Sequence, residues 1–221
     1  RMDADTTASG HGPILRRFQK ERIPILLGTQ MVAKGLDFEN VTLVGVLSAD
    51  LSLYVESFRA AERTFSLLTQ VVGRAGRGDK QGRAVIQTYT PENDVIQCAA
   101  RQDYGRFYES EIRLRQLRRC PPFADWFLFT LSGTEEGSVL RAAASVREAL
   151  RQLWGDDPET EVLGPAPAPV LKVNNRYRYR CQLVRRNDRA TRERVDSVLR
   201  WFAGQRQFRG VNLFVDCNPM E

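Results

Sequence analysis

The sequence is poor in the residues that bind metal ions. It has one histidine, His11, and four cysteines that lie far apart, and no two cysteines are separated by only two residues. A zinc site needs clustered thiolate or imidazole ligands, so we expect no metal site within these residues. No apolar run approaches the roughly 20 residues that cross a bilayer, and no signal peptide opens the sequence. These absences predict a soluble protein of a reducing, intracellular compartment, with no membrane partner.

Lysine is scarce too, although the chain is basic. The 33 basic residues are 29 arginines and 4 lysines, and they exceed the 27 acidic residues, which gives a formal net charge of +6. A basic excess favours an acidic partner, with nucleic acid first. The arginine bias itself is equally well explained by a GC-rich genome. The length of 221 residues and the 42% of hydrophobic residues suit one large domain or two modest ones.

Strand and helix patterns alternate over the first half of the chain. Short apolar runs predict buried strands at residues 25–27, 41–47 and 82–89. The continuous apolar character of the second run indicates a sheet that is covered on both faces. Helical spacing predicts a helix at residues 57–72 and a long helix over about residues 94–118. This alternation predicts an α/β domain with a mostly parallel sheet.

Two consecutive prolines, Pro121 and Pro122, mark a domain boundary, because proline cannot continue a helix. We therefore expect one domain at residues 1–119 and another at residues 120–221. The elements expected in the second domain are strand 126–131, helix 135–154, a proline-punctuated segment at 162–170, strand 177–184, helix 191–205 and strand 211–215. This βαββαβ order predicts a small α+β domain whose antiparallel sheet carries two helices on one face.

Two short stretches carry the strongest signs of chemistry. Residues 28–38 read GTQMVAKGLDF, and residues 70–77 read QVVGRAGR. The second stretch places Arg74 and Arg77 three residues apart, and arginine binds phosphate through a permanent charge and a forked guanidinium. Such a pair suits the stabilisation of charge on a γ-phosphate during transfer. A lone GRxGR is more often a glycine-capped helix end with solvated arginines, so the interpretation depends on the joint occurrence of both stretches.

Together the two stretches resemble motifs V and VI of superfamily 2 helicases, in the expected order. Their surroundings narrow the resemblance to the primosomal protein N′ family, the PriA replication-restart helicases of bacteria. The supporting segments are residues 1–7, 58–63, 87–91, PPF at 121–123, LGPAPAP at 163–169, RYRYR at 176–180 and VDCNP at 215–219. The resemblance covers essentially the whole chain. It implies a partial RecA-like helicase lobe 2 with a mostly parallel sheet, followed by the C-terminal domain.

The resemblance implies roles for individual residues of the first domain. Arg74 and Arg77 would reach the γ-phosphate of ATP, and Gln70 would couple the nucleotide to lobe closure. The other residues implied at the ATP site are Gly73, Gly76, Gly35 and Asp37, of which Asp37 varies within the family. The implied DNA contacts are Thr29, Gln30 and Lys34, although Lys34 equally suits a structural ion pair. For Arg1, Asp3 and Asp5 a role in the folding of the lobe is favoured.

A second basic feature lies in the C-terminal domain. Residues 172–194 contain nine basic and two acidic residues. In a strand, the arginines and tyrosines of RYRYR would lie on opposite faces. The DNA contacts expected here are Lys172, Arg176, Tyr177, Arg178, Tyr179 and Arg180, with arginines on phosphates and an exposed tyrosine on a base. The alternative is that the tyrosines pack inward and the arginines are simply solvated.

The chain lacks the phosphate-binding loop GxxxxGK[ST] and a DEAH-type acidic box. The resemblance implies that both precede Arg1 in a longer protein, together with a zinc-binding, cysteine-rich insertion. ATP, Mg²⁺ and zinc are thus expected for the intact protein, and no zinc for this chain. We accordingly expect this chain by itself to be inactive towards ATP.

For the intact protein, the resemblance implies an ATP-dependent 3′-to-5′ DNA helicase that remodels stalled or branched replication forks and promotes primosome assembly. The implied partners are branched and single-stranded DNA, other primosome proteins and the single-stranded-DNA-binding protein. A monomer associated with the nucleoid in the bacterial cytoplasm is expected. Two alternatives stay open: a non-catalytic module that binds branched DNA or a primosome partner, and another superfamily 2 DNA translocase.

Overall fold

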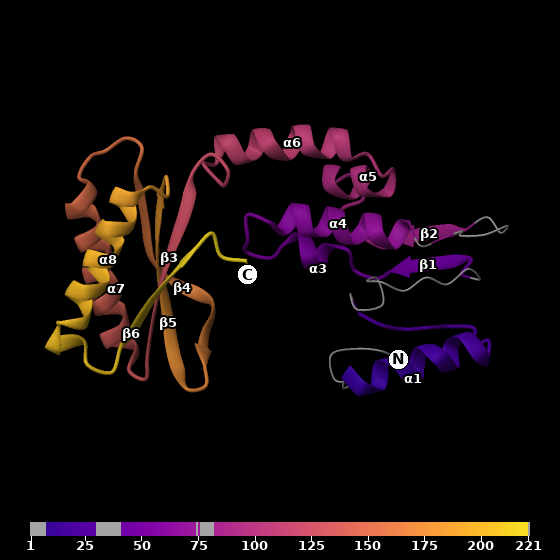
Figure 1. The fold of residues 1–221 in the computed structure, drawn as a ribbon, viewed down its shortest axis with the longest axis horizontal. Helices are drawn as coiled ribbons and strands as arrows, with labels where there is room; N and C mark the ends of the chain where they lie inside the picture. The colour runs from indigo at the N-terminus through magenta and orange to yellow at the C-terminus, as the bar shows by residue number, and fades with distance from the viewer. Residues whose placement is uncertain (1–7, 30–40, 74, 76–81, 221) are drawn as a thin grey trace. The chain divides into compact units, whose positions relative to one another are not determined.

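The computed structural model describes residues 8–29, 41–73, 75 and 82–220. Its contacts divide the chain into two compact units, Arg1–Glu111 and Ile112–Glu221 (Figure 1). The first unit contains a small parallel sheet and the second an antiparallel sheet, so the chain is a mixed α/β protein. Among the described helices, none is both long enough and apolar enough to span a bilayer.

The first unit has helices around a two-stranded parallel sheet. Strand β1 (Leu43–Val46) pairs with β2 (Arg83–Ile86), and the chain between the two strands contains α3 (Asp50–Leu53) and α4 (Ala60–Val72). The other helices in the described part of this unit are α1 (Ala8–Lys20), α5 (Asp94–Ala100) and α6 (Tyr104–Leu117), and the last residues of α6 belong to the second unit. The predicted parallel pairing is therefore confirmed for these two strands.

One face of α4 forms the centre of this unit's core. Phe65 and Leu68 are almost fully buried, and the ring of Phe65 stacks on that of Phe107 with the centroids 4.2 Å apart. Val46 and Ile86, from the two strands, pack against the same cluster.

The opposite face of the strand pair is open. Leu43 is 61% exposed and Val85 is 48% exposed. The prediction of a sheet covered on both faces is therefore wrong for the described residues. Side chains alternate between the two faces of a strand, so only every second residue of β1 faces the helices. The apolar residues at the other positions of β1 therefore do not indicate a second covered face.

Residues 25–27 do not form the buried strand that their apolar character predicts. The described sheet of this unit contains only β1 and β2, and both Ile25 and Leu27 are largely exposed. Three apolar residues offer few ladder hydrogen bonds, and Pro24 before them has no amide to donate.

The single long helix predicted over residues 94–118 is in fact two helices. Gln102 has a φ of 56°, a left-handed conformation that ends the helical path after α5. Asp103 then accepts a hydrogen bond from the amide of Arg106, 3.0 Å away, and so caps the start of α6. Helical periodicity continues across this break, which is why spacing alone does not reveal it.

Asp50 ties together the chain segments that follow β1 and β2. The residue is buried, and its carboxylate accepts hydrogen bonds from Thr88 Oγ1 at 2.8 Å, the Tyr89 amide at 3.0 Å and Thr90 Oγ1 at 2.9 Å. Burial by itself would raise the pKa of this carboxyl group. The three hydrogen bonds outweigh burial and hold the pKa below its ordinary value.

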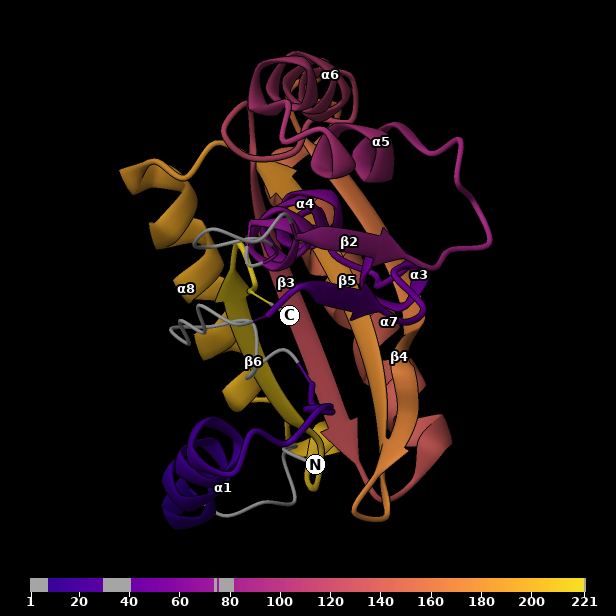
Figure 2. The same ribbon diagram turned by 90° about the vertical axis from the view of Figure 1, so that its right-hand side faces the viewer.

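The second unit has the predicted βαββαβ order. Its elements are β3 (Asp125–Gly133), α7 (Glu136–Trp154), β4 (Glu161–Val173), β5 (Arg176–Arg185), α8 (Arg189–Ala203), the 3₁₀ turn η1 (Arg206–Phe208) and β6 (Asn212–Cys217). The antiparallel sheet has the order β4-β5-β3-β6, and its four strands lie side by side in Figure 2. Both α7 and α8 lie on one face of the sheet, as expected from the sequence (Figure 1).

Strict alternation along the strands builds the core of this unit. The buried cluster takes Phe127, Phe129 and Leu131 from β3 and Cys181 and Leu183 from β5. The helices contribute a second set of buried residues, which includes Val139, Ala143, Val146, Leu150, Val195, Val198 and Phe202. Residues at the positions between the core residues of each strand therefore face away from the helices.

Strand β4 is longer than the proline-punctuated segment suggests. It runs for 13 residues, with register shifts between Leu163 and Ala166 and between Pro167 and Lys172. Because β4 is an edge strand, its prolines lie where a missing amide can be tolerated. Asn174 and Asn175, with φ of 48° and 60°, then turn the chain directly into β5.

Replacing Asp50 with asparagine should destabilise the first unit at neutral pH, because an amide cannot accept all three hydrogen bonds as a carboxylate does. The folded-state pKa of Asp50 is depressed, so its contribution to stability is complete above the unfolded pKa, about 4, and is lost as the pH falls through the folded pKa. Asp50→Asn should therefore flatten the loss of stability in acid. The measurement is chemical denaturation followed by circular dichroism at several pH values.

Glu92→Gln is the matched control for this change, because Glu92 is an exposed carboxylate of the same unit. It should leave both the midpoint and its acid dependence unchanged. Equal acid dependence in wild type and Asp50→Asn would contradict the role given to Asp50.

Candidate nucleotide and nucleic-acid sites

Helix α4 determines where the QVVGRAGR stretch begins. Its buried side, with Phe65 and Leu68, fixes the rotation of the helix, so Gln70 in the last turn is exposed. The helix ends at Gly73, whose amide donates to the carbonyl of Thr69 at 3.0 Å. A Cβ at Gly73 would lie 3.3 Å from that carbonyl oxygen, which is tighter than ordinary contact, so the position suits glycine.

The structure describes three of the residues for which ATP or DNA contacts are predicted in the first domain. Besides Gln70 and Gly73 these include Thr29, which is exposed and directly follows Gly28 at an isolated β-bridge. The predicted site residues that lie outside the described residues are Gln30, Lys34, Gly35, Asp37, Arg74, Gly76 and Arg77. Their roles, and those of Thr29, Gln70 and Gly73, stay predictions.

Strand β5 separates the tyrosines of RYRYR from its arginines. Tyr179 packs against the core cluster, and its hydroxyl donates to Glu136 Oε1 at 2.9 Å. That hydrogen bond to a carboxylate is the main reason why the pKa of Tyr179 is raised. Tyr177 lies under Lys172, whose Nζ is 4.6 Å from the ring centroid. Both rings thus have partners within the unit, and their predicted role as DNA contacts stays untested.

The three arginines that alternate with these tyrosines are half-buried and lie on the other face of the sheet. Arg176 donates to the carbonyl of Ser132 at 2.8 Å, and Arg178 donates to the carbonyl of Val170 through Nε and Nη2. Arg180 has a buried Nε without a hydrogen-bond partner in the described chain. Within the described residues, no carboxylate forms an ion pair with any of the three. Their charge is therefore available to an external anion.

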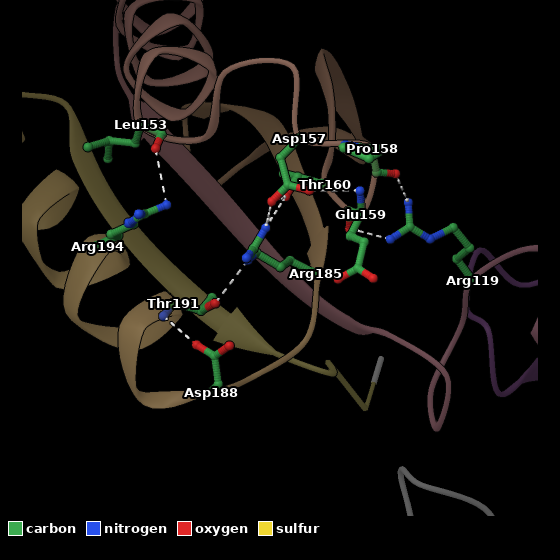
Figure 3. A network of polar contacts seen from close by, with 10 residues as sticks. All are labelled: Arg119, Leu153, Asp157, Pro158, Glu159, Thr160, Arg185, Asp188, Thr191 and Arg194. Carbon is green, nitrogen blue, oxygen red and sulfur yellow. Dashed lines mark hydrogen bonds and ion pairs between the residues drawn. The ribbon is translucent and has the colours of Figure 1, made fainter.

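Arg185, at the end of β5, has the opposite character. Figure 3 shows its guanidinium between Asp157 and Thr160 from the loop after α7 and Thr191 from α8. The hydrogen bond from Arg185 is the largest reason why the pKa of Asp157 lies below its ordinary value. This arginine of β5 joins the loop after α7 to helix α8, so it has a structural role.

Four further hydrogen bonds in Figure 3 stabilise the same region. Arg119 donates to the carbonyls of Pro158 and Glu159, and Arg194 donates to the carbonyl of Leu153 at 3.2 Å. Asp188 caps α8 by accepting from the amide of Thr191 at 2.7 Å. The long-range contacts of this network join residues 25 to 41 positions apart, so no local sequence pattern predicts them.

Metal ligands do not gather in the part of the chain that the structure describes. No group of three histidine, cysteine, aspartate or glutamate side chains there could hold a metal ion. The four cysteines, all of which the structure describes, form no disulfide bond with one another. Burial raises the pKa of the Cys181 thiol to about 12, which makes it a neutral core side chain.

Comparison with known proteins assigns a domain family to each of the two units. Residues 1–79 match the helicase conserved C-terminal domain, and residues 116–220 match the primosomal protein N C-terminal domain. The chain is 41% identical over 221 residues to replication restart protein PriA of Bacillus subtilis, which covers 99% of the chain and 27% of that protein. It is 42% identical over 182 residues to PriA of Synechocystis, covering 81% of the chain and 22% of the relative. To PriA of Chlamydia trachomatis the chain is 34% identical over 222 residues, which cover 100% of the chain and 29% of that relative.

The matched regions define the class of each unit. The first is part of a RecA-like helicase lobe 2, and the second is a primosomal C-terminal domain. The chain belongs to the PriA family of replication restart proteins and corresponds to a C-terminal part of its members. It spans about a quarter of the length of the curated relatives it matches.

Removing the guanidinium of Arg185 should destabilise the second unit, because Asp157 and Thr160 would lose their half-buried partner. Arg185→Ala is expected to lower the unfolding temperature by several degrees. Tryptophan fluorescence reports this transition selectively, since Trp126, Trp154 and Trp201 all lie in the second unit.

Arg186→Ala is the control, because the neighbouring arginine is exposed and the change in charge is identical. Its unfolding temperature should match that of the wild type. If the two variants unfolded at the same temperature, the network around Arg185 would not be structural.

Proposed function

We propose that the protein containing this chain is an ATP-dependent 3′-to-5′ DNA helicase of superfamily 2 that remodels stalled or branched forks. The observation that carries this proposal is the succession of a helicase C-terminal domain and a primosomal C-terminal domain in one chain. The names of the relatives refer to replication restart, which supports a role in primosome assembly.

In this proposal the first unit supplies charge to the ATP site. Arg74 and Arg77 follow α4 closely in the sequence, and that helix is packed on the core of the unit. Two guanidinium groups stabilise the charge that spreads over the γ-phosphate during its transfer. Gln70 links this site to movement of the lobe. The phosphate-binding loop, the Mg²⁺ site and a zinc site belong to other parts of the protein, so the chain alone does not hydrolyse ATP.

The second unit, as a domain that begins at about residue 120, would bind DNA through the arginines of β5. Arg176, Arg178 and Arg180 have no carboxylate partner among the described residues, which supports phosphate as their ligand. Lys172, exposed at the end of β4, adds a fourth positive charge nearby. Single-stranded-DNA-binding protein and other primosome proteins are further proposed partners of a monomeric protein in the bacterial nucleoid.

Arg77→Ala in the full-length protein tests the motor assignment. DNA-stimulated ATP hydrolysis should fall by about a thousandfold, the effect typical of a lost arginine finger, while affinity for fork DNA changes little. Arg83→Ala, which removes an exposed arginine of β2, should retain wild-type turnover. Hydrolysis within about twofold of wild type in Arg77→Ala would rule out this role.

Replacing Arg176, Arg178 and Arg180 together with glutamine tests the DNA-binding assignment. Fork affinity should fall. The negative slope of log K against log salt should become shallower by about 2 to 3, because three fewer phosphates are neutralised. The measurement is fluorescence anisotropy of labelled fork DNA across a salt series.

The matched control replaces Arg192, Arg206 and Arg209, which are exposed and lie outside the sheet. This control variant should keep nearly the wild-type slope. Equal slopes for the two triple variants would mean that β5 is not the phosphate-binding strand.

A further inference from the structure

The sheet of the second unit has a face that neither of its helices covers. Leu213 and Val215 of β6 pack against the core, so Phe214 between them faces away from α7 and α8. The same alternation directs Thr130 of β3 and Arg180 of β5 to that face. We call this surface the open face.

The register brings three of these side chains into one row. Thr130 lies opposite Arg180 on one side and opposite Phe214 on the other. Adjacent strands are about 4.8 Å apart, so the backbones that carry Arg180 and Phe214 are separated by roughly 10 Å. Phe214 is 54% exposed, and the small Thr130 between the two is buried. An aromatic ring and a guanidinium thus flank a short side chain in the middle of the sheet.

Positive charge collects at one end of the open face. Arg178 lies opposite Ser132, one row beyond Arg180, and Arg176 follows it along β5. The acidic residues that the strands place on this face lie toward its other end: Asp216 is opposite Leu128, and Glu161 is opposite Val184. A strand of nucleic acid that followed the arginines would place phosphates near Arg178 and Arg180 and pass beside Phe214.

We propose that the open face binds single-stranded DNA, with Phe214 stacked on an unpaired base and Arg178 and Arg180 on adjacent phosphates. Every base presents an aromatic face, but in a duplex the neighbouring base pairs cover it, so an exposed ring on a sheet selects unpaired strands. This inference rests on the proposed DNA binding of the second unit and specifies its ligand.

The test uses the whole 221-residue chain and two labelled probes, a short oligothymidylate and an abasic strand of the same length. Phe214→Leu keeps an apolar side chain but removes the ring. It should weaken binding of the oligothymidylate by about tenfold and leave binding of the abasic strand unchanged. Phe214→Trp should restore the affinity. Arg180→Gln should weaken binding of both probes, because each has a phosphate backbone.

Phe123→Leu and Arg209→Gln serve as controls, since Phe123 and Arg209 are at least partly exposed and lie outside the strands. Both should bind the two probes as the wild type does, and circular dichroism of every variant should be unchanged.

If Phe214→Leu bound the oligothymidylate as tightly as the wild type, the open face would not be a site for single strands. Salt-sensitive fork binding through β5 would still leave the proposed DNA binding of the unit in place, and the open face would then suit a protein partner. If the chain bound neither probe and no fork DNA, both this inference and the DNA-binding proposal would be wrong.

Discussion

The two-residue repeat along β5 is the constraint on which the chemistry of the second unit depends. Cys181 and Leu183 are buried under α7 and α8, and this requires Arg180 to lie on the opposite face of the sheet. A shift of the pairing by one residue would bury guanidinium groups in the core and expose apolar side chains. The free energy of the core therefore also fixes the position of the charges, so the basic surface is as well specified as the fold itself.

In the first unit, the packing of a helix in the core likewise fixes which side chains are exposed. Stacking of Phe65 on Phe107 fixes the rotation of α4, and that rotation leaves Gln70, the first residue of the QVVGRAGR stretch, exposed. Asp50 adds a second anchor, because it fixes the segments after both parallel strands with three hydrogen bonds. In open α/β sheets, ligands are bound beyond the carboxyl ends of the strands, where the loops must be held in place. The buried polar contacts of Asp50 thus lie beyond the carboxyl ends of both described strands.

The sequence predicts those features that depend on local repeats, and it fails where tertiary contacts decide. The βαββαβ order and the opposite faces of arginine and tyrosine in β5 follow from periodicity over five to ten residues. The break at Gln102 was missed because one left-handed residue leaves the helical spacing of the apolar residues intact. The row that joins Arg180 to Phe214 through β3 depends on strand register, which no single-strand pattern contains. The pairing of Arg185 with Asp157 depends on a tertiary contact between β5 and the loop after α7.

The distribution of charge in the second unit shows why a count of basic residues overestimates a binding surface. Residues 172–194 contain nine basic residues, but Arg185 is paired with Asp157 and Arg189 with Glu193. Arg194 is directed to the carbonyl of Leu153 and lies over the ring of Trp154. The carboxylates offset the charge of Arg185 and Arg189, and the contacts of Arg194 hold its side chain beside the end of α7. What remains concentrated is the group on β5, so the salt dependence of DNA binding should follow the few arginines of that strand, not the net charge of the segment.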